Sequence, residues 1–276
     1  MANTKRVITL LTDFGVNDSF VAQMKGVIYG INADANVVDI THQVRAFDIR
    51  GGAIALGLAY AYFPCDTVHV AVVDPGVGYF GRRPIIVRTR QQWFVGPDNG
   101  IFSFIYRQHQ QSVTVYHITN SSFFYKEKSS TFHGRDIFAP VAAHLSRGIA
   151  VEAFGNVIHN PVTFDIPLPT IHVENYPEHY IEGEIIYIDS FGNAFTNIEL
   201  SFFADKFSDK HSLFITYKGM VIEFQNAYAN AYDDALYAII NSNDYIELFV
   251  YKESASTKYD IKLEDKVYLH IKQATG

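Results

Sequence analysis

The feature that most constrains this chain is a short apolar run, Val68–Val73, that ends at a carboxylate. The run is rich in β-branched residues and too short for a helix, which is typical of a strand buried on both faces of a parallel sheet. Asp74 follows and opens a Pro-Gly turn, and two arginines, Arg82 and Arg83, come next. Ligands of open α/β sheets bind in the loops after the carboxyl ends of the strands. We therefore expect a ligand site directly after this strand.

Two earlier apolar runs, at residues 7–11 and 37–40, also have an acid at or near their end, Asp13 and Asp39. Segments with apolar positions at helical spacing separate the three runs. This alternation predicts an α/β N-terminal domain with a right-handed, mostly parallel sheet. Parallel strands end at one edge, so we expect the three acids to gather there. A single loop acid is more often a turn or capping residue, and that interpretation stays open for Asp13 and Asp39.

A second candidate region lies at residues 131–136, just before a helical segment. His133 precedes the amino end of that helix. The positive end of the helix dipole disfavours an imidazolium, so we expect the pKa of His133 to be lowered and its ring to be neutral. A neutral imidazole can accept a proton.

The character of the sequence changes after residue 158. Four prolines fall in a stretch without helical periodicity, which predicts a linker over 159–178 between an α/β domain, 1–158, and a second domain, 179–276. The second domain contains short strand-like runs joined by turn sequences, which predicts a smaller all-β, barrel-like or sandwich fold. The expected strands are 184–188, 194–198, 213–217, 221–224, 235–240, 245–251 and 266–271.

The charge and cysteine content exclude several classes of protein. The formal net charge is −7 and the basic residues are scattered, so we expect no nucleic-acid partner. No apolar stretch reaches the length of a membrane span, and the amino end lacks a secretory signal, so we expect a cytoplasmic protein. The single cysteine, Cys65, excludes a disulfide framework and is expected to be a small core residue.

The sequence also contains features of two other enzyme classes. Residues 76–81 match the G-x-G-x-x-G dinucleotide pattern, but a strand-like run at 85–87 follows where that fingerprint needs a helix. A metal-dependent hydrolase is the second alternative, because the chain contains oxygen and imidazole ligands but no H-x-E or H-x-x-E-H spacing. Its candidate ligands are Asp13, Asp74, Asp98, His69 and His133. We expect no metal.

Six motifs occur in a fixed order along the chain: TDFG at 12–15, DITH at 39–42, VDPGVG at 73–78, GPDNG at 96–100, FHGRD at 132–136 and DSFGN at 189–193. Together they resemble the S-adenosylmethionine hydroxide adenosyltransferases, relatives of the fluorinases and chlorinases. The resemblance extends from about residue 7 to 271.

The resemblance implies hydrolysis of S-adenosylmethionine to adenosine and L-methionine, with water or hydroxide attacking the ribose C5′ atom. It implies a homotrimer whose active sites lie between the N-terminal domain of one subunit and the C-terminal domain of its neighbour. S-adenosylmethionine is then the substrate, and no cofactor is expected. A halide-dependent halogenase and a non-catalytic S-adenosylmethionine sensor are further alternatives.

The family's water-handling residues fall on Asp74, Arg82 and His133. Arginine stays protonated, so the base is either Asp74 or neutral His133. The loop that contains Tyr79 is one residue longer than is usual in the hydrolases, which leaves Arg83 as an alternative to Arg82. Halide-binding relatives have an aromatic residue at the position of Asp74. A carboxylate repels halide, so its presence favours hydrolysis over halogenation.

The resemblance also implies a substrate-binding set. In the N-terminal domain, Asp13 matches the acid that binds the ribose diol, Phe47 a hydrophobic wall, and Phe132 an aromatic flank of adenine or ribose.

In the C-terminal domain, Phe191 matches a second aromatic flank. Asp189 and Asn193 are expected to hold the amino and carboxylate groups of the methionine moiety, with a further contact from Ser242. Residues 245–251 lack the small side chains common where the family backbone meets adenine, so no adenine contact is assigned there.

Overall fold

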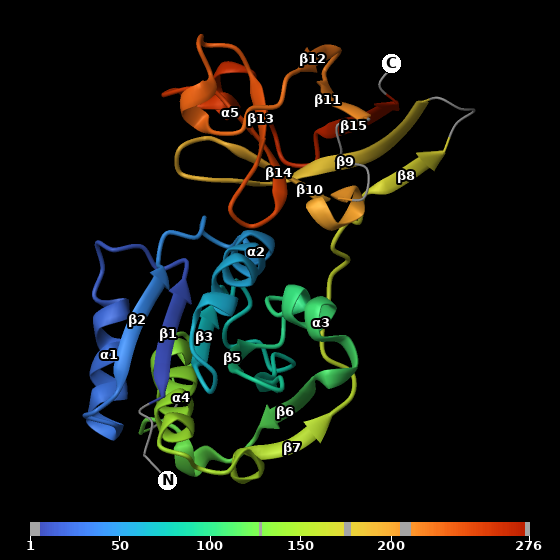
Figure 1. Ribbon diagram of the computed structural model, residues 1–276. Helices are drawn as coiled ribbons and strands as arrows, with labels where there is room; N and C mark the ends of the chain where they lie inside the picture. The colour runs from blue at the N-terminus through green and yellow to red at the C-terminus, as the bar shows by residue number, and fades with distance from the viewer. Residues whose placement is uncertain (1–5, 127–128, 174–177, 205–210, 274–276) are drawn as a thin grey trace. The chain divides into compact units, whose positions relative to one another are not determined.

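The chain divides into two compact units, residues 1–166 and 167–276, each with its own sheet (Figure 1). The structure is a computed structural model, and it describes residues 6–126, 129–173, 178–204 and 211–273.

The N-terminal unit contains a seven-stranded sheet with the order β2-β1-β3-β5-β4-β6-β7. The pairings β2–β1, β1–β3 and β3–β5 are parallel, whereas β5–β4, β4–β6 and β6–β7 are antiparallel. The α/β fold is confirmed, and the sheet is mixed, with the parallel part where the strand–helix alternation predicts it. The strands are β1 Val7–Thr12, β2 Asn36–Thr41, β3 Val68–Val72, β4 Pro84–Arg88, β5 Trp93–Pro97, β6 Thr114–Ile118 and β7 Gly155–Ile158.

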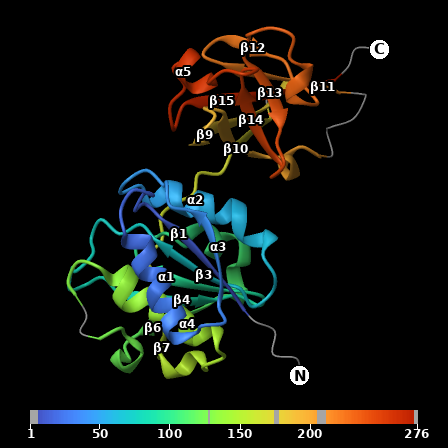
Figure 2. The same ribbon diagram turned by 90° about the vertical axis from the view of Figure 1, so that its left-hand side faces the viewer.

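Helices cover both faces of this sheet (Figure 2). Successive residues of a strand point to opposite faces, so Leu10 of β1 packs in one apolar core and Leu11 in the other. The core of Leu10 includes α1 and α4, and the core of Leu11 includes α2 and α3. The helices are α1 Phe20–Ile31, α2 Ile49–Ala59, α3 Ser103–His109 and α4 Ala139–Ser146.

Short helical turns connect several of these elements. They span Tyr60–Tyr62, Gln110–Ser112, Ser121–Phe123 and Val151–Ala153 in the N-terminal unit, and Leu200–Phe202 and Tyr228–Asn230 in the C-terminal unit.

The register of β1 and β3 places two of the predicted acids at one edge of the sheet. Thr12 pairs with Val72, so Asp13 and Asp74 follow the ends of adjacent parallel strands. Asp39 lies differently, because it is inside β2 and pairs with Leu10. The edge after β1 and β3 therefore gathers two acids, and Asp39 is set back from it.

The C-terminal unit is an antiparallel sheet with the order β12-β11-β15-β9-β10-β14-β13, and β8 pairs with β9 beside that path. An isolated bridge between Phe224 and Ala238 joins the segment after β12 to β13, so the two ends of the sheet meet and the unit is barrel-like, as predicted. The strands are β8 Thr170–Val173, β9 Glu178–Ile188, β10 Ala194–Glu199, β11 His211–Tyr217, β12 Met220–Ile222, β13 Tyr237–Ile240, β14 Tyr245–Phe249 and β15 Lys266–Gln273.

Three details differ from the sequence-based expectations. Strand β8 lies within the segment predicted as a linker, because an extended proline-flanked segment can still pair with a sheet edge. A short helix, α5 Ala255–Lys258, follows β14. Cys65 was predicted in the core but is exposed, since it lies in the turn before β3, where Asp66 adopts a φ of 63°.

In the part of the chain that the structure describes, none of the helices combines the length and the apolar character needed to cross a bilayer.

Candidate functional site

A cavity of about 300 Å³ lies at the edge of the N-terminal sheet where β1 and β3 end. Five of the predicted site residues line it: Asp13, Phe47, Asp74, Phe132 and His133. They come from four separate segments of the sequence, so the fold of this unit brings them together. Arg82 joins them through its contact with Asp74.

Asp74 presents one occupied and one unoccupied carboxylate oxygen. Oδ1 accepts a hydrogen bond from the backbone N–H of Gly76 at 3.2 Å and lies 3.1 Å from Nε of Arg82. Oδ2 is buried and has no hydrogen-bond partner among the described residues. Burial raises the pKa of Asp74, the nearby Arg82 opposes that rise, and the charge of Asp13 adds to it. A buried acceptor in this state can take a hydrogen bond or a proton from a bound molecule.

The two arginines after this loop have different partners. The guanidinium of Arg82 contacts Asp74 and donates from Nη1 to the carbonyl oxygen of Asp98 at 3.1 Å. Arg83 instead donates to Oδ2 of Asp98 at 2.8 Å and to Asn160. A Cβ atom at Gly76 would lie 2.6 Å from Nη2 of Arg82, so a side chain at this position would shift the guanidinium from its place over the loop. The geometry therefore favours Arg82 over Arg83 as the partner of Asp74.

Asp13 shapes the opposite loop of the cavity. Its Oδ2 accepts the backbone N–H of Phe47 at 2.9 Å, and Phe47 adopts a φ of 70°. This left-handed conformation is uncommon for a residue with a side chain. The Phe47 ring is 71% exposed, so it is available to cover a ligand.

His133 and Phe132 come from the start of a helical segment. A π-helical turn, Gly134–Phe138, follows His133 and continues into α4. His133 is buried, with 4% of its surface exposed. The ring of Phe132 packs edge-on against Phe14 and Phe20, at centroid distances of 5.7 and 5.3 Å. The rings of Phe14, Phe20 and Phe132 therefore form an apolar wall of the cavity, beside the polar side chains of Asp74 and His133.

The five candidate ligands of the metal-dependent alternative do not gather. Asp13, Asp74 and His133 line the cavity, but His69 hydrogen-bonds Thr9 at 2.7 Å and stacks on Phe94 within the core. Burial lowers the pKa of His69 to about 3, so its ring is neutral.

Asp98 has a structural role. Its carboxylate accepts hydrogen bonds from the backbone N–H of Val162 at 2.7 Å and from Nε of Arg83 at 2.8 Å. Among residues 6–126, 129–173, 178–204 and 211–273, no group of three or more His, Cys, Asp or Glu side chains is placed to hold a metal ion.

Two other motif residues have structural partners. His42 lies between Asp39 and Thr12, with Nε2 3.0 Å from the Asp39 carboxylate and Nδ1 2.9 Å from the Thr12 hydroxyl. Asp39 also pairs with Lys25 at 2.6 Å. These contacts account for the DITH motif as a link between β1 and β2.

The glycine-rich loop at 76–81 leads into strand β4 and not into a helix. The segment after the third glycine is therefore a strand where a dinucleotide fingerprint needs a helix, which confirms the interpretation made from the sequence.

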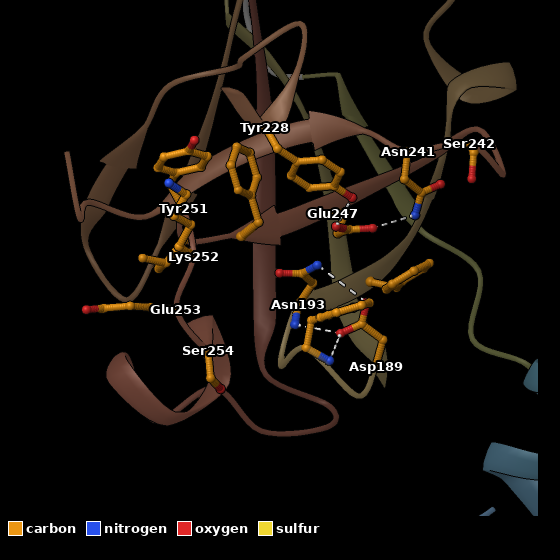
Figure 3. A pocket seen from close by; sticks show the side chains of 14 residues that line it. Asp189, Asn193, Tyr228, Asn241, Ser242, Glu247, Tyr251, Lys252, Glu253 and Ser254 are labelled. Carbon is orange, nitrogen blue, oxygen red and sulfur yellow. Dashed lines mark hydrogen bonds between the residues drawn. The ribbon is translucent and has the colours of Figure 1, made fainter. Parts of the chain in front are cut away.

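A second cavity, of about 620 Å³, lies within the C-terminal unit (Figure 3). The four predicted residues of this domain, Asp189, Phe191, Asn193 and Ser242, all line it. Asp189 accepts the backbone N–H groups of Phe191 and Asn193 through Oδ1, both at 2.9 Å. The Asp189 carboxylate therefore builds the DSFGN turn with Oδ1, and its Oδ2 makes a long contact, 3.4 Å, to the amide of Asn193.

Sequence reasoning missed Glu247, a carboxylate in the wall of the second cavity. It is 2% exposed, and its partners are Tyr228 and Asn241 (Figure 3). The available signal was a charged residue in the middle of an apolar strand, Tyr245–Phe249. Alternation along that strand places Glu247 on the face opposite Ile246 and Leu248, which pack in the barrel core.

Comparisons with known proteins cover both units. The family model of the SAM hydroxide adenosyltransferase N-terminal domain matches residues 8–155, and that of the C-terminal domain matches residues 183–268. The chain belongs to the SAM hydroxide adenosyltransferase family. The cavities of both units therefore fall within the parts of the chain that define the family.

Individual relatives resemble the chain over nearly its whole length. It is 31% identical over 273 residues to an (R)-S-adenosyl-L-methionine hydrolase of Methanocaldococcus jannaschii, which covers 95% of this chain and 94% of the relative. It is 25% identical over 300 residues to a fluorinase of Nocardia brasiliensis, with 96% of each chain covered. A solved structure of an uncharacterised conserved protein from Thermotoga maritima is 33% identical and superposes with a TM-score of 0.85, over 95% of this chain and 99% of that one.

Proposed function

We propose that this member of the SAM hydroxide adenosyltransferase family hydrolyses S-adenosylmethionine to adenosine and L-methionine. The observation that carries the proposal is the buried Oδ2 of Asp74, which has no hydrogen-bond partner in the described part of the chain. It belongs to the same cavity that His133 lines and lies beside the guanidinium of Arg82. The relatives named as (R)-S-adenosyl-L-methionine hydrolases support the same substrate.

The chemistry requires activation of water and little help for the leaving group. A sulfonium departs as a neutral thioether, whereas water, with a pKa of about 15.7, is a poor nucleophile. In the proposed step a water oxygen forms a bond to C5′, the C5′–S bond breaks with its electron pair going to sulfur, and the water proton goes to Oδ2 of Asp74. Burial raises the pKa of Asp74, which makes the carboxylate a better proton acceptor. Arg82 and His133 then stabilise the negative charge that develops on the oxygen.

The remaining site residues bind different parts of the substrate, some from the N-terminal unit and some from the C-terminal unit. Asp13 would bind the ribose diol, with Phe47 and Phe132 beside the sugar or base. Phe191 would provide a second aromatic flank in the other cavity. We further propose a homotrimer in the cytoplasm, with each active site built from the N-terminal unit of one subunit and the C-terminal unit of another.

The methionine moiety would lie in the C-terminal cavity, where Asp189, Asn193 and Ser242 are placed. An ammonium group beside Oδ2 of Asp189 would form a charge-assisted hydrogen bond. No cofactor is required, because the sulfonium already activates the carbon.

A single labelling experiment tests the reaction. Purified protein is incubated with S-adenosylmethionine in ¹⁸O water, and the nucleoside is identified by mass spectrometry. Adenosine with the label in its 5′ hydroxyl is the expected product. Unlabelled adenosine, or release of adenine, would contradict attack of water at C5′. The relatives are named as hydrolases of the R epimer at sulfur. Separate incubations with the R and S epimers test whether this chain has the same preference.

Halogenation is the second candidate because a fluorinase is among the relatives. The carboxylate of Asp74 argues against it, since a halide in this cavity would lie beside a negative charge. We expect the rate of adenosine formation to be unchanged by fluoride or chloride, and a 5′-halogenated nucleoside as the main product would reverse the assignment. Retained activity in the presence of a chelator would dismiss a metal-dependent reaction.

The proposed assembly is tested independently. Sedimentation equilibrium is expected to give three times the chain mass of 31.2 kDa. A fully active monomer would exclude sites shared between subunits.

A further inference from the structure

Glu247 occupies the centre of strand β14 on the face that lines the C-terminal cavity. Its neighbours across the sheet are Phe195 of β10 and Ile239 of β13. A carboxylate enclosed by apolar strands is costly unless its oxygens are hydrogen-bonded. Its presence therefore needs an explanation in terms of the groups it contacts.

Both oxygens of Glu247 are occupied by neutral donors. The Tyr228 hydroxyl donates to Oε1 at 2.7 Å, and Nδ2 of Asn241 donates to Oε2 at 3.1 Å (Figure 3). Burial raises the pKa of Glu247, the two donors oppose that rise, and the charge of Asp189 adds to it. Each oxygen of Glu247 therefore already has one partner in the wall of the cavity.

Asn241 links Glu247 to the turn that contains Ser242. While its amide nitrogen donates to Glu247, its Oδ1 accepts the backbone N–H groups of Asn243 at 3.0 Å and Tyr245 at 3.2 Å. These bonds fix the orientation of the amide and the path of the β13–β14 turn. Ser242, exposed at the cavity, lies in this turn.

Tyr228 links Glu247 to a second part of the cavity wall, the helical turn Tyr228–Asn230. This turn is far from Glu247 in sequence, and the ring of Tyr228 packs edge-on against Phe249 with the centroids 4.8 Å apart. The Glu247 carboxylate thus connects the loop of Tyr228 to the β13–β14 hairpin.

We infer that Glu247 is a positioning residue for S-adenosylmethionine, which holds Tyr228 and the Ser242 turn in the geometry that receives the part of the substrate bound by the C-terminal unit. This inference rests on the proposed function. It assigns Glu247 an effect on affinity and not on the chemical step, because its contacts are with the cavity walls.

Glu247→Gln is the first test, because glutamine has the same shape but only one acceptor oxygen. Its amide nitrogen must face either Asn241, which also presents a donor, or Tyr228. We expect the KM for S-adenosylmethionine to rise about tenfold, with kcat within about twofold of the wild type, as for loss of a hydrogen bond to a charged group. Tyr228→Phe removes one donor and should raise KM about threefold, by the smaller cost of a single hydroxyl.

Tyr217→Phe is the matched control. Tyr217 donates its hydroxyl to a carboxylate of the same unit, Asp265, at 2.5 Å, but neither residue lines the cavity. We expect this variant to lose thermal stability comparably to Tyr228→Phe while its KM stays unchanged. Equal KM values for the two variants, or a fall in kcat at constant KM in Glu247→Gln, would overturn the inference. If Glu247→Gln does not fold, the two tyrosine variants alone decide.

Calorimetry distinguishes failure of the proposed function from failure of the inference about Glu247. If the wild type forms no adenosine but binds S-adenosylmethionine, the hydrolase proposal fails, and the same ratios measured as Kd decide the role of Glu247. If the wild type neither hydrolyses nor binds S-adenosylmethionine, both proposals are wrong.

Discussion

Asp74 and Glu247 are buried carboxylates in the walls of two different cavities, and burial raises the pKa of both. Their surroundings differ. Asp74 has a cationic partner, Arg82, and one oxygen without a partner among the described residues, whereas both oxygens of Glu247 accept hydrogen bonds from neutral groups. A buried acid with one open oxygen can take a proton from a bound molecule, whereas an acid that holds a neighbour with each oxygen stabilises the arrangement of those neighbours. Under the proposed function, this difference places the proton-transfer step in the N-terminal cavity and gives Glu247 an effect on affinity in the C-terminal cavity.

The largest expected effect follows from replacing Asp74. Asp74→Asn keeps the size of the side chain but removes the proton acceptor, so kcat should fall by about 10²–10⁴-fold, the usual contribution of a general base. The measurement is adenosine formation at saturating S-adenosylmethionine. Asp39→Asn is the control, since Asp39 pairs with Lys25 and His42 and lies outside the cavity. A similar loss in both variants would contradict the special role of Asp74.

Substitutions of Arg82 and Arg83 test which of the two arginines acts beside Asp74. Arg82→Ala removes the cation beside Asp74, and kcat should fall by about 10–100-fold, the cost of a charged hydrogen bond. Arg83→Ala should leave kcat nearly unchanged but lower the Tm, because the side chain of Asp98, 1% exposed, loses the cation that pairs with it. That loss is expected to cost up to about 3 kcal/mol, since Arg83 is partly exposed. The reverse pattern would identify Arg83 as the functional residue.

The pH dependence tests which group is the base. Since the proposed base must be ionised, kcat/KM should fall about tenfold per pH unit below the raised pKa of Asp74. The contribution of Asp74 to stability runs in the opposite direction. A raised native-state pKa favours folding at acidic pH, and this contribution is lost as pH rises through that pKa. If Asp74→Asn retains the same acidic limb with its residual activity, then another group, such as His133, is the base.

The smallest effect is expected at Asp189. Asp189→Asn keeps Oδ1 for the backbone N–H groups of the DSFGN turn but removes the negative charge of this side chain from the cavity. KM for S-adenosylmethionine should rise about three- to tenfold, within the range for a charged hydrogen bond, while kcat and Tm stay near those of the wild type. Calorimetric Kd values provide a second measurement. A fall in kcat without a change in KM would break the division between the two cavities.

Several site residues could be found in the sequence because the signal was local. Asp74 directly follows a buried strand, and His133 directly precedes a helical segment, so the position of each follows from the pattern around it. Arg82 and Arg83 could not be separated in this way, since they are adjacent. Only the path of the loop over Gly76, and the placement of Asp98 and Asn160, sends one guanidinium toward Asp74 and the other away.

Glu247 marks the limit of a local pattern. The sequence shows an acid within an apolar strand, which is equally compatible with a solvent-facing position at a sheet edge. Its burial depends on strands β10 and β13 pairing on either side, and its partners come from Tyr228 and Asn241 in two other segments.

By itself, the sequence determined the alternation of strands and helices up to the third strand, the division into an α/β part and a β part, and the family to which the motifs belong. Those properties follow from periodicity and local chemistry, which are present in the chain before it folds. The tertiary structure alone decided that half of the N-terminal strand pairings are antiparallel, that Arg82 and not Arg83 contacts Asp74, and that Glu247 is enclosed. The physical reason is that strand pairing, burial and hydrogen bonding between distant segments are set by packing, which no short stretch of sequence contains.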